Sequence, residues 1–176
     1  MGLHLGRREP AHVLHHPGWC RLALLLRPVG PPHAKYRLDE AGRTVEETRF
    51  TWDGARLAEQ TTTAVGTTLT WDYDGFRPLV QYERKPLSGE EVDSRFFAIV
   101  TDLVGTPTEL VDQDGAIAWR GRSAVWGTTA VNPDATVHTP LRYPGQYADP
   151  ETGLHYNYFR HYDPETAGTS VPTRWA

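Results

Sequence analysis

The chain has 176 residues, of which 39% are hydrophobic and 11% aromatic, enough apolar material for one folded domain and too much for a disordered chain. Its 18 basic and 22 acidic residues are scattered without runs and give a formal net charge of -4, which argues against a nucleic-acid groove or an anionic membrane patch. A single cysteine, Cys20, excludes an intrachain disulfide framework and a cysteine-based zinc site.

Residues 1–34 differ in composition from the rest, and we predict that they are disordered or a non-native start. They mix Pro, His and Arg around one short apolar run at 22–26. That run is shorter than the roughly 7–15 residues of a signal-peptide core and the ~20 needed to cross a bilayer, so we expect neither a signal peptide nor a transmembrane segment. Because His12, His15 and His16 lie in a proline-punctuated segment with no periodicity to hold them together, we predict no metal site.

From Tyr36 onward the sequence is typical of β structure. Short segments rich in Thr, Val, Tyr, Trp and Phe alternate with Asp-Gly and Pro-Gly turn signals, and no window of helix length carries an apolar stripe with a period of 3.6 residues. Asp followed by Gly favours a hairpin turn, because Gly tolerates positive φ and Asp bonds to the local backbone. We therefore expect hairpin tips near Gly54, Gly75 and Gly115.

These turns also form a repeat. The segment WDGARL at 52–57 returns twenty-one residues later as YDGFRPL at 73–79, and YRLDEAGR at 36–43 has a related form. One hairpin cannot bury its apolar face alone, so hairpins of similar design line up edge to edge in an extended sheet. The sequence therefore predicts an all-β fold of antiparallel hairpin repeats.

The repeated units resemble tyrosine-aspartate (YD) repeats, and residues 96–163 resemble the core domain of RHS repeat proteins. The family pattern runs from a Gly-Thr-Pro turn through Trp-Gly and Gly-Gln-Tyr to Glu-Thr-Gly-Leu and Tyr-Asp-Pro. The matching segments, in order, are 101–107, 109–115, Trp119, 125–127, 142–147, 151–157 and 160–164. The resemblance covers about 130 residues, counted from Tyr36.

The resemblance implies a large protein whose repeats wind a curved β-sheet strip into a hollow shell, which in characterised members encloses a C-terminal toxin. It implies as partners the remainder of an RHS shell or another RHS chain, with toxin cargo in the intact protein. Intact relatives are secreted or lie at the cell surface. On this basis residues 35–95 are YD-type hairpin repeats, residues 96–166 are core-like, and residues 167–176 are an aberrant tail.

In many members of that family the core domain cuts the chain just behind itself by aspartate-dependent autoproteolysis. The family pattern continues into a second Asp-Pro-x-Gly turn, which cleavage follows, whereas this chain is interpreted as inserting Ala167 before Gly168, and no second such turn remains. We therefore expect a truncated structural segment without catalysis of its own. One alternative is an aromatic-rich module that binds carbohydrate or a cell surface. A less favoured one is autoproteolysis, with Asp149 and Asp163 as the candidate catalytic residues.

Those two aspartates open a turn that occurs twice, DPET at 149–152 and again at 163–166. Between the copies, residues 153–162 are predicted to form one aromatic strand. Its alternation separates two faces, one with Tyr156, Tyr158 and Tyr162 and the other with His155 and His161. Asp-Pro at a turn is more often a capping device than a catalytic pair, so we interpret the repetition as structural.

Other chemistry has little support in the sequence. We find no motif of a serine hydrolase, zinc protease or nucleotide site, and we expect no cofactor. Exposed aromatic rings could make a surface module that binds carbohydrate, but core packing is the simpler expectation for Trp52, Trp71, Trp119 and Trp126. A short strip leaves open strand edges and exposed tyrosines, which predicts self-association.

Overall fold

The computed structural model describes residues 11–14, 22–25, 31–87, 92–157 and 160–170. Within these residues there is no helix, and so no helix that could cross a membrane. Eleven strands form one sheet: β1 (Ala11–Leu14), β2 (Leu22–Leu25), β3 (Ala34–Leu38), β4 (Thr44–Asp53), β5 (Arg56–Thr62), β6 (Thr67–Asp74), β7 (Arg77–Pro86), β8 (Val92–Thr101), β9 (Pro107–Asp112), β10 (Ile117–Ser123) and β11 (Thr129–Val131). Four form a second sheet: β12 (Gln146–Ala148), β13 (His155–Asn157), β14 (Arg160–Asp163) and β15 (Gly168–Ser170).

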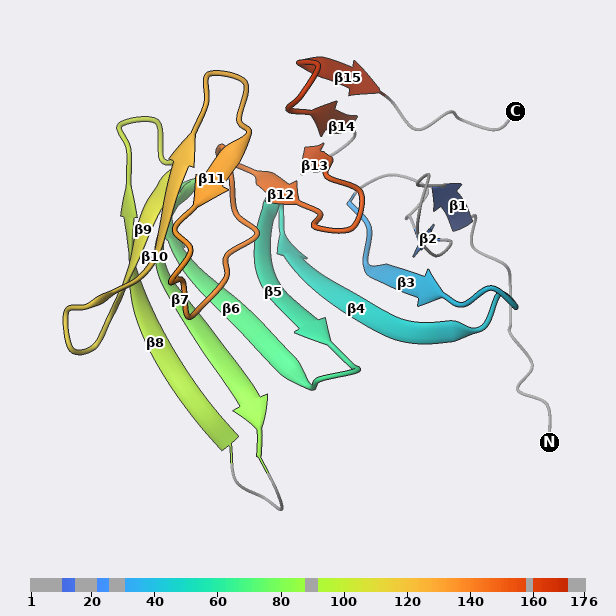
Figure 1. Ribbon diagram of the computed structural model, residues 1–176, viewed down its shortest axis with the longest axis horizontal. Helices are drawn as coiled ribbons and strands as arrows, with labels where there is room; N and C mark the ends of the chain where they lie inside the picture. The colour runs from blue at the N-terminus through green and yellow to red at the C-terminus, as the bar shows by residue number, and fades with distance from the viewer. Residues whose placement is uncertain (1–10, 15–21, 26–30, 88–91, 158–159, 171–176) are drawn as a thin grey trace.

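The long sheet is a curved strip in which every strand pairs with its neighbour in sequence, always antiparallel (Figure 1). This order follows from short turns between strands, since antiparallel neighbours need only a tight hairpin to connect them. The predicted all-β class, the antiparallel hairpins and the curved strip are therefore confirmed. β8 runs across the predicted boundary at residue 95, so the division into repeat and core-like segments stays a prediction about the sequence.

The hairpin tips lie where the Asp-Gly pairs predicted them. Gly54 and Gly75 each open a two-residue loop and have φ of 61° and 57°, whereas the residues that follow them do not have positive φ. A two-residue turn whose first central position alone needs positive φ is the type II′ turn, which glycine favours. The aspartate before each glycine is the last residue of its strand and pairs with the arginine after the turn.

Three other tips share a three-residue design with the sequence D-x-x-G. In each, the aspartate Oδ1 accepts the N–H of the residue four positions later at 2.8 Å, and the glycine N–H donates to the aspartate carbonyl. The glycines have φ between 78° and 103°, as expected of a type I turn closed by a glycine bulge. The aspartate and glycine pairs are Asp39 with Gly42, Asp102 with Gly105, and Asp112 with Gly115.

The sheet begins earlier in the chain than the sequence predicted. β1 pairs with β2 and β2 pairs with β3, so two strands of the segment 1–34 continue the strip at its edge. The short apolar run of this segment carries β2, and a run of that length suits one strand as well as a loop. Residues 31–34 are also described, and the buried Ala34 begins β3, so the prediction of disorder is wrong there too. The rest of that prediction concerns residues 1–10, 15–21 and 26–30, which lie outside the described residues.

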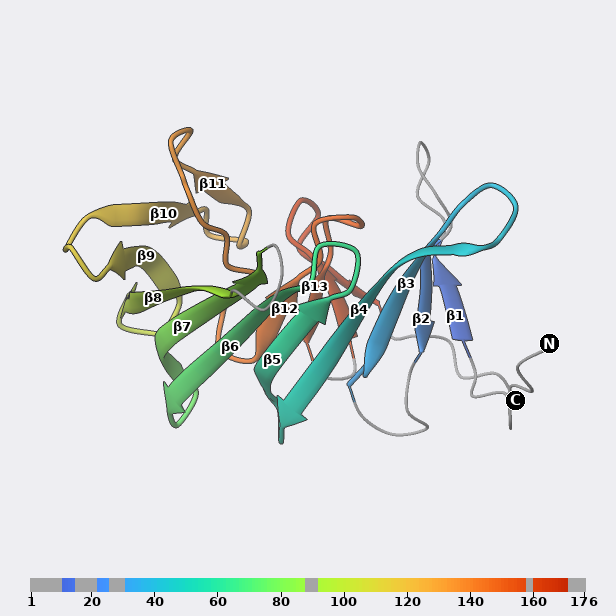
Figure 2. The same ribbon diagram turned by 90° about the horizontal axis from the view of Figure 1, so that it is seen from below.

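One hydrophobic core joins the two sheets. Segment 132–145 and the small sheet lie against one face of the strip (Figures 1 and 2), and the strip turns alternate residues of each strand towards them. Trp119 is only 1% exposed, and each such fully buried side chain contributes about 1.5–3 kcal/mol. The largest contributors are Phe50, Leu57, Leu69, Trp71, Phe97, Ile99, Leu110 and Trp119 from the strip, and Val137, Leu141, Tyr147 and Tyr156 from the covering part.

The predicted single strand at 153–162 is wrong. β13 and β14 pair antiparallel, with His155 opposite Tyr162 and Tyr156 opposite His161. Residues 158 and 159 between them are Tyr and Phe and carry no Gly, Pro, Asn or Asp turn signal, which is why the sequence pattern did not reveal a hairpin. The predicted faces change accordingly, and Tyr156 is buried in the core rather than exposed.

Candidate functional site

A buried ion pair links the start of the strip to the small sheet. Lys35 lies on β3 and is only 5% exposed. Its Nζ is 2.8 Å from Oδ1 of Asp149 and 3.1 Å from Oε2 of Glu151, both in the turn that follows β12. One of the two predicted candidate residues is thus held by a lysine that lies 114 positions earlier in the chain.

Asp149 also organises its own turn. Its Oδ1 accepts the Glu151 N–H at 3.2 Å, and its Oδ2 accepts the Thr152 hydroxyl at 2.9 Å. Gly153 donates its N–H to the Asp149 carbonyl and has a φ of 72°, the left-handed region that glycine enters at little cost. The first DPET turn is therefore a capped turn, as the structural interpretation expects.

Aromatic side chains enclose this ion pair. The Trp52 Nε1 donates to the Pro32 carbonyl at 2.7 Å, and the rings of Phe50 and Tyr147 lie 5.1 Å apart. Burial by itself disfavours the charged Lys35, but Tyr147, when its phenol is ionised, and the carboxylates of Asp149 and Glu151 outweigh that effect and raise the pKa of Lys35 above its usual value. Burial also raises the pKa of the Tyr147 phenol, which is neutral at physiological pH.

The space beside the ion pair is small. It has a volume of about 20 Å³ and is lined by Pro32, Trp52, Tyr156 and His161 as well as the charged groups. A volume of this size holds about one water molecule. The arrangement accordingly fits a structural contact between two sheets, with no room for a peptide or a sugar ring.

The second DPET turn repeats the hydrogen bonds of the first without a lysine among them. Oδ1 of Asp163 accepts the Glu165 N–H at 2.9 Å, and its Oδ2 accepts the Thr166 hydroxyl at 2.7 Å. The Thr166 hydroxyl and the Glu165 amide hold the pKa of the Asp163 carboxyl below its usual value. The ionised Asp163 carboxylate therefore caps this turn.

The two candidate aspartates lie at the same end of the small sheet without touching. The Asp149 N–H donates to the Leu154 carbonyl, and the pairing of His155 with Tyr162 puts Leu154 opposite Asp163. Two strand spacings, roughly 10 Å, therefore separate the two backbones. The contact between Lys35 and Asp149 could not be predicted from the sequence. Lys35 is one of only two lysines in the chain, but this rarity does not indicate its partner.

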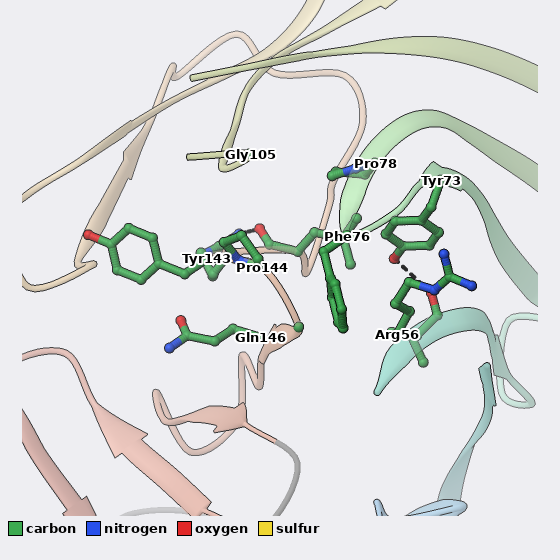
Figure 3. A pocket seen from close by; sticks show the side chains of 12 residues that line it. Arg56, Tyr73, Phe76, Pro78, Gly105, Tyr143, Pro144 and Gln146 are labelled. Carbon is green, nitrogen blue, oxygen red and sulfur yellow. Dashed lines mark hydrogen bonds between the residues drawn. The ribbon is translucent and has the colours of Figure 1, made fainter. Parts of the chain in front are cut away.

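The segment 141–146 forms a second seam between the strip and the small sheet. Figure 3 shows the Phe76 ring, from the β6–β7 tip, between Pro144 on one side and Arg56 and Tyr73 on the other. A side chain at Gly145 would reach within 3.6 Å of the backbone oxygen at the neighbouring β4–β5 tip. The remaining volume of about 10 Å³ is at most that of one water, so this hollow is also a packed seam.

Most of the tryptophans considered for a carbohydrate-binding surface are buried. Trp71 and Trp119 lie in the core, and Trp52 is half-buried against it, as the core-packing prediction expects. Trp126 differs from that prediction, since it is 59% exposed at the β10–β11 tip. Tyrosine hydroxyls hold that tip, with Tyr162 donating to the Trp126 carbonyl at 2.8 Å and Tyr143 to the Val125 carbonyl at 3.1 Å.

Comparison with known proteins assigns the chain to a family through strands of the long sheet. A family model described as RHS protein matches residues 97–132, which run from β8 to just past β11. The chain belongs to the RHS family. It is 38% identical over 133 residues to double-stranded DNA deaminase toxin A of Burkholderia cenocepacia, which covers 68% of this chain and 9% of that protein.

Other RHS relatives show the same partial overlap. The chain is 32% identical over 154 residues to the probable deoxyribonuclease RhsB of Dickeya dadantii, a match covering 79% of this chain and 10% of that protein. It is 29% identical to the toxin protein Tse5 of Pseudomonas aeruginosa, covering 75% of this chain and 12% of Tse5. The chain thus spans about a tenth of the length of these curated relatives.

Solved structures share the RHS fold. The Photorhabdus luminescens Tc holotoxin pore, with an aspartate-to-alanine mutation in TccC3, matches with a TM-score of 0.63 at 21% identity, covering 88% of this chain and 8% of that one. A crystal structure of TcdB2–TccC3 without its hypervariable C-terminal region matches with a TM-score of 0.61 at 20% identity, covering 86% of this chain and 8% of that one. At such identities the likeness concerns the fold alone.

Proposed function

We propose that this chain is a structural wall segment of an RHS shell that, in the intact protein, encloses and delivers a C-terminal toxin, and that it has no catalysis of its own. The observation that carries the proposal is the single curved strip of eleven strands in sequential order. A strip of this kind can be extended by further hairpins at either edge, which is what a wound wall requires.

The relatives' names support the toxin context. One is named a deaminase toxin and another a probable deoxyribonuclease, and this chain covers only about a tenth of each. We assign those activities to parts of the relatives outside the overlap. In this chain the hollow beside Asp149 has room for about one water, which favours packing over substrate binding at that residue.

Autoproteolysis is a second candidate, because Asp149 differs from Asp163 in one specific respect. Asp149 is buried and bonded to Lys35, whereas Asp163 bonds within its own turn. The Asp149 carboxyl accepts a hydrogen bond from Lys35, and its oxygens are the kind of group that can accept a proton from a water molecule. This reading needs a scissile segment next to Asp149.

Mass spectrometry of the purified chain separates the two candidates. For a structural segment, the intact mass of 19.8 kDa persists for days, and the variants Asp149→Asn and Asp163→Asn behave in the same way. A discrete fragment that disappears in either variant would establish the autoprotease instead.

The shell proposal also predicts a partner. An RHS chain from which the matching segment has been deleted should co-purify with this chain in equal amounts, because each would cover the other's open strand edges. If this chain elutes separately from such a deletion variant, whose folding is verified by circular dichroism, the wall-segment proposal is wrong.

A further inference from the structure

Strands β9 and β10 separate into a fork. Their ladder pairs Ile117 with Val111, Trp119 with Leu110 and Arg120 with Glu109, and it ends there. Beyond that point β10 pairs with β11, and β9 continues towards β8 (Figure 2). Continuing the register would have placed Gly121 to Ser123 opposite residues 106–108.

The β10 side of the fork presents unpaired backbone groups. Arg120 bonds to the β11 side, since its N–H donates to Oδ1 of Asn132 at 2.6 Å and its carbonyl accepts the Asn132 N–H. Ala124 bonds to the same side through its N–H and the Thr128 carbonyl. Backbone groups alternate along a strand, so those of Gly121 and Ser123 point away from β11. The Gly121 N–H still belongs to the last rung of the β9–β10 ladder, which leaves the Gly121 carbonyl and the N–H and carbonyl of Ser123 directed into the fork.

The fork borders an open groove of about 490 Å³, a volume within the range of about 300–1,000 Å³ typical of ligand sites. It is some twenty times larger than the hollow beside Lys35. Its lining is polar and comes from Asp102, Thr106, Thr108, Glu109, Arg120, Gly121, Arg122 and Ser123.

Most of the charges in this lining are already bonded. Glu109 accepts from Arg120 at 2.9 Å, and Oδ1 of Asp102 accepts three backbone N–H groups of its own turn. Among the described residues, Arg122 has no carboxylate within ion-pair distance, and it is exposed at the groove wall. The fork therefore offers backbone hydrogen bonds and one free guanidinium.

We propose that this fork binds an extended segment of a partner polypeptide, which adds a strand to the β10 edge and places a carboxylate side chain against Arg122. Strand addition supplies affinity through backbone hydrogen bonds, and the fork-shaped guanidinium recognises a carboxylate by two parallel bonds. The site is separate from Asp149 and does not depend on the wall-segment proposal.

Binding of a synthetic peptide tests the site. The probe is a labelled, end-capped pentapeptide with aspartate at its centre between threonine and valine residues, and fluorescence anisotropy measures its affinity for the full chain. One control peptide has lysine at the centre. The other has proline on both sides of the aspartate, which removes backbone N–H donors. We expect the aspartate peptide to bind at least tenfold more tightly than either control.

Variants assign the binding to the fork. Arg122→Glu should weaken the aspartate peptide at least tenfold, and Arg122→Gln should weaken it severalfold. The matched control Arg84→Glu, an exposed arginine on β7, should leave the affinity unchanged. In hydrogen exchange, the bound peptide should protect the amide of Ser123.

Two outcomes would overturn the proposal. Equal affinity for the aspartate and lysine peptides, or no loss in Arg122→Glu, would remove Arg122 from recognition. Protection at the edges of β11 or β15 instead of Ser123 would place the binding on an ordinary sheet edge. Light scattering must also show that Arg122→Glu leaves self-association unchanged, since a decrease would identify a second copy of this chain as the occupant.

Discussion

Ala167 has a backbone conformation that the other DPET turn gives to a glycine. Its φ of 55° is the only positive value at a non-glycine residue in the described part of the chain, and Gly153 at the equivalent position has 72°. A side chain in this region is strained by about 1–2 kcal/mol. Ala167 therefore replaces the turn glycine and is not an insertion before Gly168.

We predict that Ala167→Gly stabilises the chain by about 0.5–1 kcal/mol, because relief of the strain exceeds the extra entropy that glycine gives the unfolded chain. Urea unfolding followed by fluorescence measures the change. The reverse substitution, Gly153→Ala, should destabilise by a similar amount. A loss of stability in Ala167→Gly would show that the left-handed conformation at 167 is not strained.

Lys35 should be among the most sensitive positions in the chain. Lys35→Met leaves the Asp149 carboxylate buried without its partner, and breaking a buried pair in this way costs about 3–5 kcal/mol. Partial exposure of Glu151 places our expectation near the lower end of that range. Urea unfolding measures it. The control is Lys85→Met at the other lysine, where Glu83 keeps Arg95 and the loss should stay below about 1 kcal/mol.

His155 should make the fold sensitive to acid. Burial and the nearby charge of Arg142 lower the pKa of His155 to about 4, whereas in the unfolded chain it is near the usual 6.5. The unfolded state therefore binds more protons as the pH falls, and stability is lost between about pH 6.5 and 4. We expect a loss of about 1–3 kcal/mol across this window.

Urea unfolding at a series of pH values checks this expectation. In His155→Gln the dependence between pH 6.5 and 4 should be flatter than in the unmodified chain, because glutamine does not titrate. A variant with the same slope as the unmodified chain would assign the acid sensitivity to other groups.

Among the strands, β7 holds the covering segment on the strip through one buried amide. Gln81 is fully buried, accepts the Trp71 Nε1–H at 2.8 Å and donates to the His138 carbonyl at 2.8 Å. Gln81→Leu leaves both partners unsatisfied and should cost about 2–4 kcal/mol. Urea unfolding measures the loss, and hydrogen exchange should show faster exchange at residues 136–140. Gln60→Leu on the neighbouring part of the face is the control, since its Oε1 has no bonded partner.

Local signals in the sequence explain which elements could be predicted. The tips at Gly54, Gly75 and Gly115 depend on an aspartate and a glycine within a few residues, so the pattern is visible in a short window. The β13–β14 hairpin has no such signal at residues 158 and 159. β2 was missed because four apolar residues fit a strand or a loop equally well.

Of the candidate site, only the two aspartate turns could be predicted from the sequence. The repeated DPET motif pointed to Asp149 and Asp163, because aspartate caps its own turn through neighbouring residues. Nothing in the sequence pairs Lys35 with a residue 114 positions away, and only the packing of the small sheet on the strip brings them together. The fork at Arg122 was equally invisible, since it depends on where a ladder ends.

At the scale of the whole molecule, the strip and the small sheet each have two edge strands that pair on one side only within the described residues. Unpaired edges and exposed apolar side chains such as Val125 and Trp126 favour association. We therefore predict oligomers at micromolar concentration. Size-exclusion chromatography with light scattering measures this directly, and a stable monomer of 19.8 kDa with a cooperative unfolding transition would contradict it.

The Lys35–Asp149 pair also sets an order of events during synthesis. Every ladder of the strip joins neighbours in sequence, so each hairpin can form soon after it leaves the ribosome. Lys35 must wait for 114 further residues, which at about 5–20 residues per second takes roughly 6–23 seconds. During that interval the apolar face of the strip is uncovered, and a chaperone has its longest opportunity to bind it.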